Sequence, residues 1–178
     1  IAYDGTTLAS DSRSSMGTMI YEEDAQKIYT KVGPFAVLAI AGDYQAALDT
    51  MDLIGDFTKL EHIRNIPSEE IGDVSLIGFT YDGKLWSYAG DKSCELRADR
   101  PFATGSGGEY ALAAMDLGKT AEEAVLYAST RDMFTNSITQ VAVIYQEDPD
   151  EVTYEVTYEV VSGQSIKWPM VSKQMRAG

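Results

Sequence analysis

The chain has 178 residues, a length that suits a single domain with a sizeable core. Acidic residues outnumber basic residues 28 to 14, which gives a formal net charge of -14. A phosphate backbone or an anionic membrane surface repels such a chain, and the longest basic cluster, residues 173–176, is short and interrupted. The composition therefore predicts neither a nucleic-acid partner nor a membrane partner.

The rare residue types exclude several kinds of site. Cys94 is the single cysteine, so no disulfide can form within the chain, and we expect a cytoplasmic protein. His62 is the single histidine, which excludes a His-rich metal centre and makes Ser-His-Asp or Cys-His catalysis a poor candidate. No apolar run is long enough to span a bilayer, and no signal peptide is visible. We expect no metal and no cofactor.

The first half of the chain predicts short strands followed by one long helix. Asp4-Gly5 between apolar residues indicates a hairpin. The run FAVLAIA is continuously apolar, as expected of a strand that is buried on both faces. The apolar period then changes to that of an amphipathic helix, for which Asp43 is a suitable N-cap. The predicted strands cover residues 1–13 in two pieces, parts of 19–31, and 35–41, and the helix covers 43–63.

The second half predicts more strands and two shorter helices. Gly118 marks the end of one helix, and the capping-box pair Thr120 and Glu123 marks the start of the next. The expected strands cover residues 73–81, 84–89, a stretch near Phe102, 139–146 and 152–161, and the expected helices cover 109–118 and 121–133. This order predicts one α+β domain, residues 1–178, built as a four-layer αββα sandwich of two antiparallel sheets between helix layers. The N-terminal strand is expected to be central.

A glycine-rich loop, Gly105–Gly108, stands between a predicted strand and a predicted helix. The dinucleotide-binding pattern needs a glycine where Tyr110 stands, and no Lys-Ser/Thr follows as in a P-loop. Backbone N–H groups at a helix start can bind an anion of any sort, and a tight turn explains the loop equally well. By itself this loop predicts no ligand.

Several polar elements follow one another at particular spacings. Asp11 ends the second predicted strand, and Lys27 follows sixteen residues later. The other elements are Ala41-Gly42, Gly105 to Gly108, and Arg131-Asp132 with Thr135-Asn136. In this order they resemble the proteasome β-type N-terminal nucleophile hydrolases, including HslV-type peptidases and their phage relatives. The resemblance runs from Ile1 to about Tyr145, and residues 146–178, a hairpin and tail, have no clear family counterpart.

The resemblance implies an N-terminal nucleophile hydrolase fold and a threonine as the nucleophile, but neither Thr6 nor Thr7 suits that role. If Thr6 led the chain, the family lysine would fall near Leu38, a buried strand residue. With Asp11 and Lys27 as partners, the nucleophile falls two residues upstream of Ile1, outside the printed sequence. We therefore expect Thr6 and Thr7 to be ordinary strand residues.

The resemblance also implies a role for each site residue. Lys27 lowers the hydroxyl pKa of the nucleophile, Asp11 holds Lys27, and the Gly42 N–H stabilises the oxyanion. The free α-amine, with a reference pKa near ~8, is the base. Orientation of that amine is assigned to Ser106, Asp132 and Thr135, with support from Arg13, Gly105 and Gly107. The substrate pocket is assigned to Ser14, Ala25, Tyr29, Ile40 and Tyr44, which favour an apolar or aromatic residue before the scissile bond.

Other interpretations of the same residues stay open. Asp11 and Lys27 also fit an ion pair with a purely structural role. Ser106 also fits a helix cap, and Asp132 fits a residue at the end of a helix that faces water. Asp43 after Ala41-Gly42 departs from the family and predicts altered substrate choice or weaker activity.

At the level of the whole protein, the resemblance implies a homo-oligomeric ring that cleaves peptides or unfolded proteins. A stacked double ring and an ATP-dependent unfoldase are further implied partners. The alternatives are a catalytically inactive ring scaffold and a hydrolase of non-peptide amides. The sequence fixes neither the ring size nor the physiological substrate.

Overall fold

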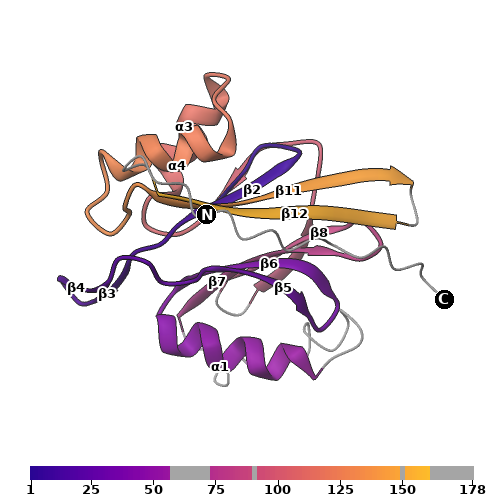
Figure 1. Ribbon diagram of the computed structural model, residues 1–178, viewed down its shortest axis with the longest axis horizontal. Helices are drawn as coiled ribbons and strands as arrows, with labels where there is room; N and C mark the ends of the chain where they lie inside the picture. Colours follow the sequence, from indigo (N-terminus) through magenta and orange to yellow (C-terminus); the bar gives the residue numbers. More distant parts are fainter. Residues whose placement is uncertain (57–72, 90–91, 149–150, 161–178) are drawn as a thin grey trace.

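The computed structural model describes residues 1–56, 73–89, 92–148 and 151–160, and within them the chain is a mixed α/β structure with three helices and antiparallel sheets (Figure 1). The helices are α1 (Tyr44–Gly55), α3 (Gly108–Asp116) and α4 (Ala121–Ser129). The predicted tail beyond Val160 lies outside the described residues, as does the part of the predicted long helix that contains His62.

The first sheet has five strands in the order β10-β1-β2-β11-β12. Their bounds are Phe102–Ala103, Ala2–Tyr3, Thr7–Asp11, Ile138–Asp148 and Glu151–Val160. β1 lies between β10 and β2, so the N-terminal strand is an interior strand, as predicted. The predicted Asp-Gly hairpin joins β1 to β2, with Gly5 at a φ of 113°.

The prediction that Thr6 and Thr7 are both strand residues is wrong for Thr6. Thr7 begins β2, but Thr6 lies in the turn before it. One Asp4 carboxylate oxygen accepts hydrogen bonds from the Thr6 N–H, the Thr6 hydroxyl and the Thr7 N–H, so the short Asp4 side chain forms the turn. The other oxygen accepts from the Ala121 N–H at 2.8 Å, which ties the turn to the start of α4.

The second sheet has five strands, each paired with its neighbours in the chain. The bounds of β5 to β9 are Ile28–Val32, Phe35–Gly42, Val74–Thr80, Leu85–Ala89 and Lys92–Leu96. The first six residues of β6 are all buried, in agreement with its continuous apolar run. A separate hairpin consists of β3 (Ser14–Met16) and β4 (Met19–Glu22). Strands β3 and β9 were not predicted, since both are short with little apolar alternation, and their pairing partners decide their structure.

Three apolar clusters give the packing order of these elements. One joins the facing sides of the two sheets and includes Tyr3, Leu8 and Ile77. A second joins the second sheet to α1, and a third joins the first sheet to α3 and α4 (Figure 1). The third cluster is mostly alanine, and such small side chains let α3 and α4 approach β1 and β2 closely. This close approach brings the loops at the ends of both helices beside the start of β1.

The helix ends follow the predicted capping, with one exception. The Asp43 side chain caps α1, and Thr120 and Glu123 form the predicted capping box of α4. α4 ends at Ser129, so the predicted extension to residue 133 is wrong. The Asp132 carboxylate accepts from the Phe134 N–H and the Thr135 hydroxyl, and these local bonds compete with further helical turns. Asp132 and Thr135 therefore lie in a loop after the helix.

Candidate active site

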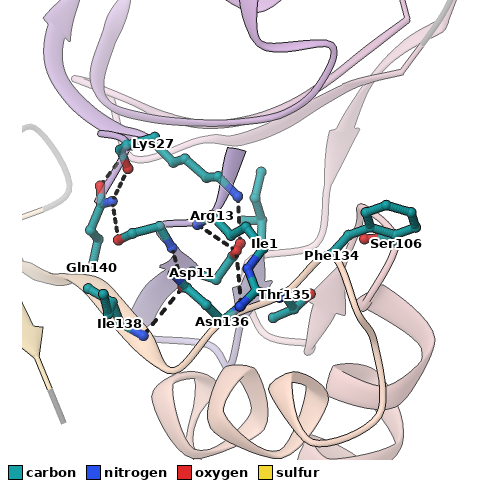
Figure 2. Close-up of polar contacts among 12 residues, drawn as sticks. Ile1, Asp11, Arg13, Lys27, Ser106, Phe134, Thr135, Asn136, Ile138 and Gln140 are labelled. Atoms are coloured by element: carbon teal, nitrogen blue, oxygen red, sulfur yellow. Dashed lines mark hydrogen bonds and ion pairs between the residues drawn. The ribbon is translucent and has the colours of Figure 1, made fainter. Parts of the chain in front are cut away.

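A cleft of about 360 Å³ opens where the start of β1 meets the ends of several other segments. It is lined by Ile1, just before β1, and by Asp11, at the end of β2. Lys27, just before β5, and Gly42, at the end of β6, line it from the second sheet's side. The loops around α3 and after α4 complete it with Thr104, Gly105, Ser106, Gly107, Phe134 and Thr135. Segments that are far apart in the sequence thus bring most of the predicted site residues to one place (Figure 2).

Asp11 and Lys27 form an ion pair at the base of this cleft. Lys27 Nζ lies 2.7 Å from Asp11 Oδ1, and the two side chains are only 12% and 9% exposed. Asp11 Oδ2 accepts from the backbone N–H of Arg13 at 3.0 Å and of Asn136 at 3.4 Å. Solvent screens so buried a pair only weakly. The pair therefore holds the Lys27 side chain in place beside the start of β1.

Ser106, Asp132 and Thr135 form a second polar cluster. Asp132 Oδ2 accepts from the Ser106 and Thr135 hydroxyls, each at 2.6 Å. Burial is the largest single influence on the pKa of Asp132 and raises it, but these two bonds and the Phe134 N–H together bring the pKa below its ordinary value. A Cβ at Gly107 would lie 2.7 Å from Thr135 Oγ1, so a glycine is needed beside this cluster.

The acid stability of the protein is expected to depend on Asp132. Because its folded-state pKa lies below the ordinary 3.8, its carboxylate stabilises the fold above pH 3.8, and this contribution is lost as the pH falls through the folded-state pKa. In urea denaturation, the wild type should lose free energy of unfolding more steeply below about pH 4 than Asp132→Asn, and the two curves should run parallel above about pH 5. A difference that stays constant down to about pH 3 would contradict this linkage.

Gly42 stands at the end of β6, where the chain enters α1. Its φ is 101°, and a Cβ there would collide with the backbone carbonyl of Asp73, so only glycine fits. Asp43 Oδ1 accepts from the Ala46 N–H at 2.8 Å. The Asp43 carboxylate is thus engaged at the start of α1.

The predicted substrate pocket is brought together only in part. Ser14, Ile40 and Tyr44 line the cleft, but Ala25 and Tyr29 do not. Ala25 is 1% exposed, and Tyr29 packs on the apolar cluster under α1 because its position in β5 points it there. The cleft is lined instead by residues that the sequence analysis did not assign, among them Ala47, Asp73 and Ser75. Nothing in the sequence pattern marks these three.

Arg13 and Gly105, predicted as supporting residues, lie at the edge of the same cleft. The Arg13 guanidinium pairs with Glu23 at 3.1 Å and donates to the Met133 carbonyl at 2.6 Å. The pKa of Glu23 is lowered, first by its hydrogen bonds from Arg13 and then by a hydrogen bond from Asn136. Gly105 has a φ of 90°, which suits a tight turn without a side chain.

Two amides that were not assigned to the site hold it together. Asn136 Oδ1 accepts from the Ser12 N–H at 3.0 Å, and its Nδ2 donates to both the carbonyl and the carboxylate of Glu23. Gln140 is 1% exposed and contacts the segments of both Asp11 and Lys27. The one available signal for Gln140 was a long polar side chain within the largely apolar segment ITQVAVI.

The nitrogen of Ile1 lies inside the cleft wall. It donates to the Thr104 carbonyl at 3.0 Å, and the Thr104 N–H donates to the Ile1 carbonyl at 3.0 Å, which extends the pairing of β1 with β10. The start of β1 is therefore held against β10 at the wall of the cleft that Asp11, Lys27, Ser106 and Thr135 also line.

In the part of the chain that the structure describes, no helix is long and apolar enough to cross a membrane. Within the same residues, no group of three or more His, Cys, Asp or Glu side chains could hold a metal ion.

Comparison with known proteins points to one class. No protein-family model matches the chain. It is 25% identical to "Proteasome subunit beta" of Haloquadratum walsbyi, covering 88% of this chain and 75% of that protein, and 26% identical to the protein of the same name of Halorubrum lacusprofundi, covering 85% and 74%. It is 24% identical to "Proteasome subunit beta 2" of Pyrococcus abyssi, covering 86% and 87%. The chain is thus similar to proteasome β subunits over most of its length.

Proposed function

We propose that the protein is a threonine-type peptidase subunit of the N-terminal nucleophile class, with an αββα core and an HslV-like Thr135-Asn136 pair. The observation that carries this proposal is the placement of the two polar clusters around Ile1. The buried Asp11–Lys27 pair and the two hydroxyls held by Asp132 line the same cleft as Ile1, where the segment that precedes β1 enters. The similarity to proteasome β subunits supports the same class.

The strand register supports a nucleophile two residues before Ile1. In the β1–β2 pairing Ala2 is opposite Ala9 and Tyr3 is opposite Leu8, so a continued β1 places the two preceding residues opposite Asp11 and Ser12. Side chains alternate along a strand, and Ile1 and Tyr3 both face the second sheet. A threonine two residues before Ile1 has the same parity as Ile1, and its hydroxyl is directed to the side from which Lys27 enters.

Each group then has one task in peptide hydrolysis. The free α-amine takes the proton of the threonine hydroxyl, the oxygen attacks the peptide carbonyl, and Lys27 stabilises the developing charge. The Gly42 N–H binds the oxyanion, and the C–N bond breaks as the amine leaves with the proton. Water then hydrolyses the ester and frees the threonine. Ser106 and Thr135, held by Asp132, orient the α-amine.

Intact mass and N-terminal sequencing, followed by a peptide epoxyketone, test this function. The reagent requires both a threonine hydroxyl and a free α-amine. We expect a mature chain that starts with threonine two residues before Ile1 and gains one epoxyketone adduct there. A mature chain without that threonine, or a chain that forms no adduct, would instead support an inactive ring scaffold. An adduct without turnover of peptides, but with turnover of small amides, would indicate the non-peptide hydrolase.

We further propose that Tyr44, with Ser14 and Ile40, selects the residue before the scissile bond. Tyr44 and Tyr29 pack on the same apolar cluster, but of the two only Tyr44 lines the cleft. Tyr44→Ala should therefore change the ratio of kcat/KM between aromatic and small residues at that position by about tenfold, and Tyr29→Ala should leave the ratio within about twofold. A fluorogenic peptide panel measures both ratios. Equal changes in the two variants would contradict this assignment.

We also propose a homo-oligomeric ring. The β3–β4 hairpin exposes four large apolar side chains, namely Met16, Met19, Ile20 and Tyr21, at 48% to 68% of their surface. Such a patch is typical of a surface that another subunit covers. Light scattering should give a mass of several subunits for the wild type and a smaller mass for Met19→Lys with Tyr21→Lys. A monomeric wild type would contradict the ring.

A further inference from the structure

We propose that Gln140 is a positioning residue that fixes Lys27 against Asp11 by clamping the start of β5 to the end of β2. This inference rests on the proposed peptidase function for its effect on the reaction. The clamp itself is a matter of structure that can be tested without activity.

The Gln140 side chain has all four of its hydrogen-bonding positions filled. Oε1 accepts from the backbone N–H of Lys27 at 2.8 Å and of Ile28 at 3.0 Å. Nε2 donates to the Ser12 hydroxyl and to the Ala25 carbonyl, each at 2.7 Å. Two N–H donors on one side and a carbonyl on the other fix the orientation of the amide, since a flipped amide would face two donors with its NH₂ group.

The bonds of Gln140 leave little freedom for the backbone of Lys27. Gln140 holds the Lys27 N–H, and the Lys27 carbonyl accepts from the Ile40 N–H at 2.9 Å. Only side-chain torsions then decide where Nζ lies, and the Asp11 carboxylate 2.7 Å away selects among them. Figure 2 shows Gln140 and Asp11 reaching Lys27 from its two ends.

Gln140 also connects elements of the two sheets, beside the backbone bond from the Ala25 N–H to the Ser12 carbonyl at 2.8 Å. It belongs to β11 in the first sheet, and Lys27 immediately precedes β5 in the second. Another of its partners, Ser12, directly follows Asp11, so one side chain contacts the segments that carry both members of the ion pair. At 1% exposure, the amide exchanges none of these partners for solvent.

The chemical consequence is preorganisation. A misplacement of a reacting group by about 1 Å can lower a rate about 100-fold, and Lys27 Nζ stands at the end of a long, flexible side chain. Without the amide, the buried N–H groups of Lys27 and Ile28 lose their acceptor, and this segment must shift to find another. Nζ then shifts with it, while Ile40 and Tyr44 keep the shape of the cleft.

Two variants and one matched control test the clamp. Gln140→Met keeps the size of the side chain and removes all four bonds. Gln140→Asn keeps an amide but shortens its reach by one methylene. It provides a second test if the Gln140→Met protein does not fold. Thr139→Val is the control, because Thr139 is also fully buried in β11. This substitution removes one hydrogen bond, from the Thr139 hydroxyl to Glu122, which lies on the side of α4 and away from Lys27.

The first measurement is independent of activity. The full-length protein is briefly acetylated with acetic anhydride, and mass spectrometry compares labelling of Lys27 with that of the exposed Lys84 and Lys119. Relative labelling of Lys27 should rise several-fold in both Gln140 variants and remain at the wild-type level in Thr139→Val. Unchanged labelling in the Gln140 variants, or an equal rise in Thr139→Val, overturns the clamp.

The second measurement is steady-state hydrolysis of a fluorogenic peptide. Both Gln140 variants should lower kcat by about 10- to 100-fold with KM within about twofold, and Thr139→Val should change neither constant by more than about twofold. A raised KM with kcat unchanged overturns the positioning role. A wild type that hydrolyses no peptide and forms no epoxyketone adduct refutes the proposed function, and the labelling experiment still decides the clamp.

Discussion

Replacing Lys27 by alanine is expected to abolish peptide hydrolysis and to destabilise the protein at the same time. The change removes the positive charge beside the proposed nucleophile, and we expect kcat to fall by at least about 1,000-fold. It also leaves the 9% exposed Asp11 carboxylate without its cation, which should lower the free energy of unfolding by about 3 kcal/mol. Peptide turnover and urea denaturation near neutral pH measure the two effects.

Lys84→Ala provides the matched control for Lys27→Ala. Lys84 also pairs with an aspartate, Asp82 at 3.2 Å, but the side chains are 48% and 60% exposed. Solvent screens such a pair, so the control should change the free energy of unfolding by less than about 1 kcal/mol and leave turnover intact. If Lys27→Ala lost stability but kept full activity, the pair would have only the structural role that the sequence left open.

Gly42→Ala is expected to have the second large effect. A non-glycine residue at a φ of 101° is strained, and the added Cβ would collide with the Asp73 carbonyl, so the β6–α1 junction must move. We expect the free energy of unfolding to fall by about 3 kcal/mol. Movement of the Gly42 N–H away from the oxyanion should lower kcat by about 100-fold.

Gly55→Ala separates this strain from a general effect of replacing glycine. Gly55 is the last residue of α1, and a Cβ there meets nothing within 4 Å. The control should leave peptide turnover unchanged and raise the free energy of unfolding by up to about 1 kcal/mol. A Gly42→Ala protein that is as stable and as active as Gly55→Ala would show that the junction relaxes without consequence for the cleft.

The sequence predicted those features whose causes are local. Asp43 and Thr120 cap helices because their side chains reach backbone N–H groups three residues ahead. The Asp4-Gly5 turn and the apolar run 35–41 were likewise readable, because turn chemistry and continuous burial leave direct marks on the residues concerned. The spacing of sixteen residues between Asp11 and Lys27 predicted their ion pair, but only through the resemblance to a known family.

The end of α4 and the composition of the cleft depend on contacts that the sequence does not display. The periodic pattern continues to residue 133, but bonds to the Asp132 carboxylate end the helix at Ser129. Tyr29 was predicted to line the pocket, yet β5 directs it toward α1, and Asp73, the residue before β7, lines the cleft instead. Which side chains meet there is decided by how the two sheets face each other.

By itself, then, the sequence determined most of the strands and helices, the Asp4-Gly5 turn and the helix caps, and through the resemblance it pointed to the Asp11–Lys27 pair. The tertiary structure decided how those residues are held. Gln140 is 113 residues from Lys27 and 128 from Ser12, and no periodicity or spacing rule connects positions so distant. A buried amide finds its partners only when two sheets pack together, because each unpaired donor or acceptor would otherwise destabilise the interior.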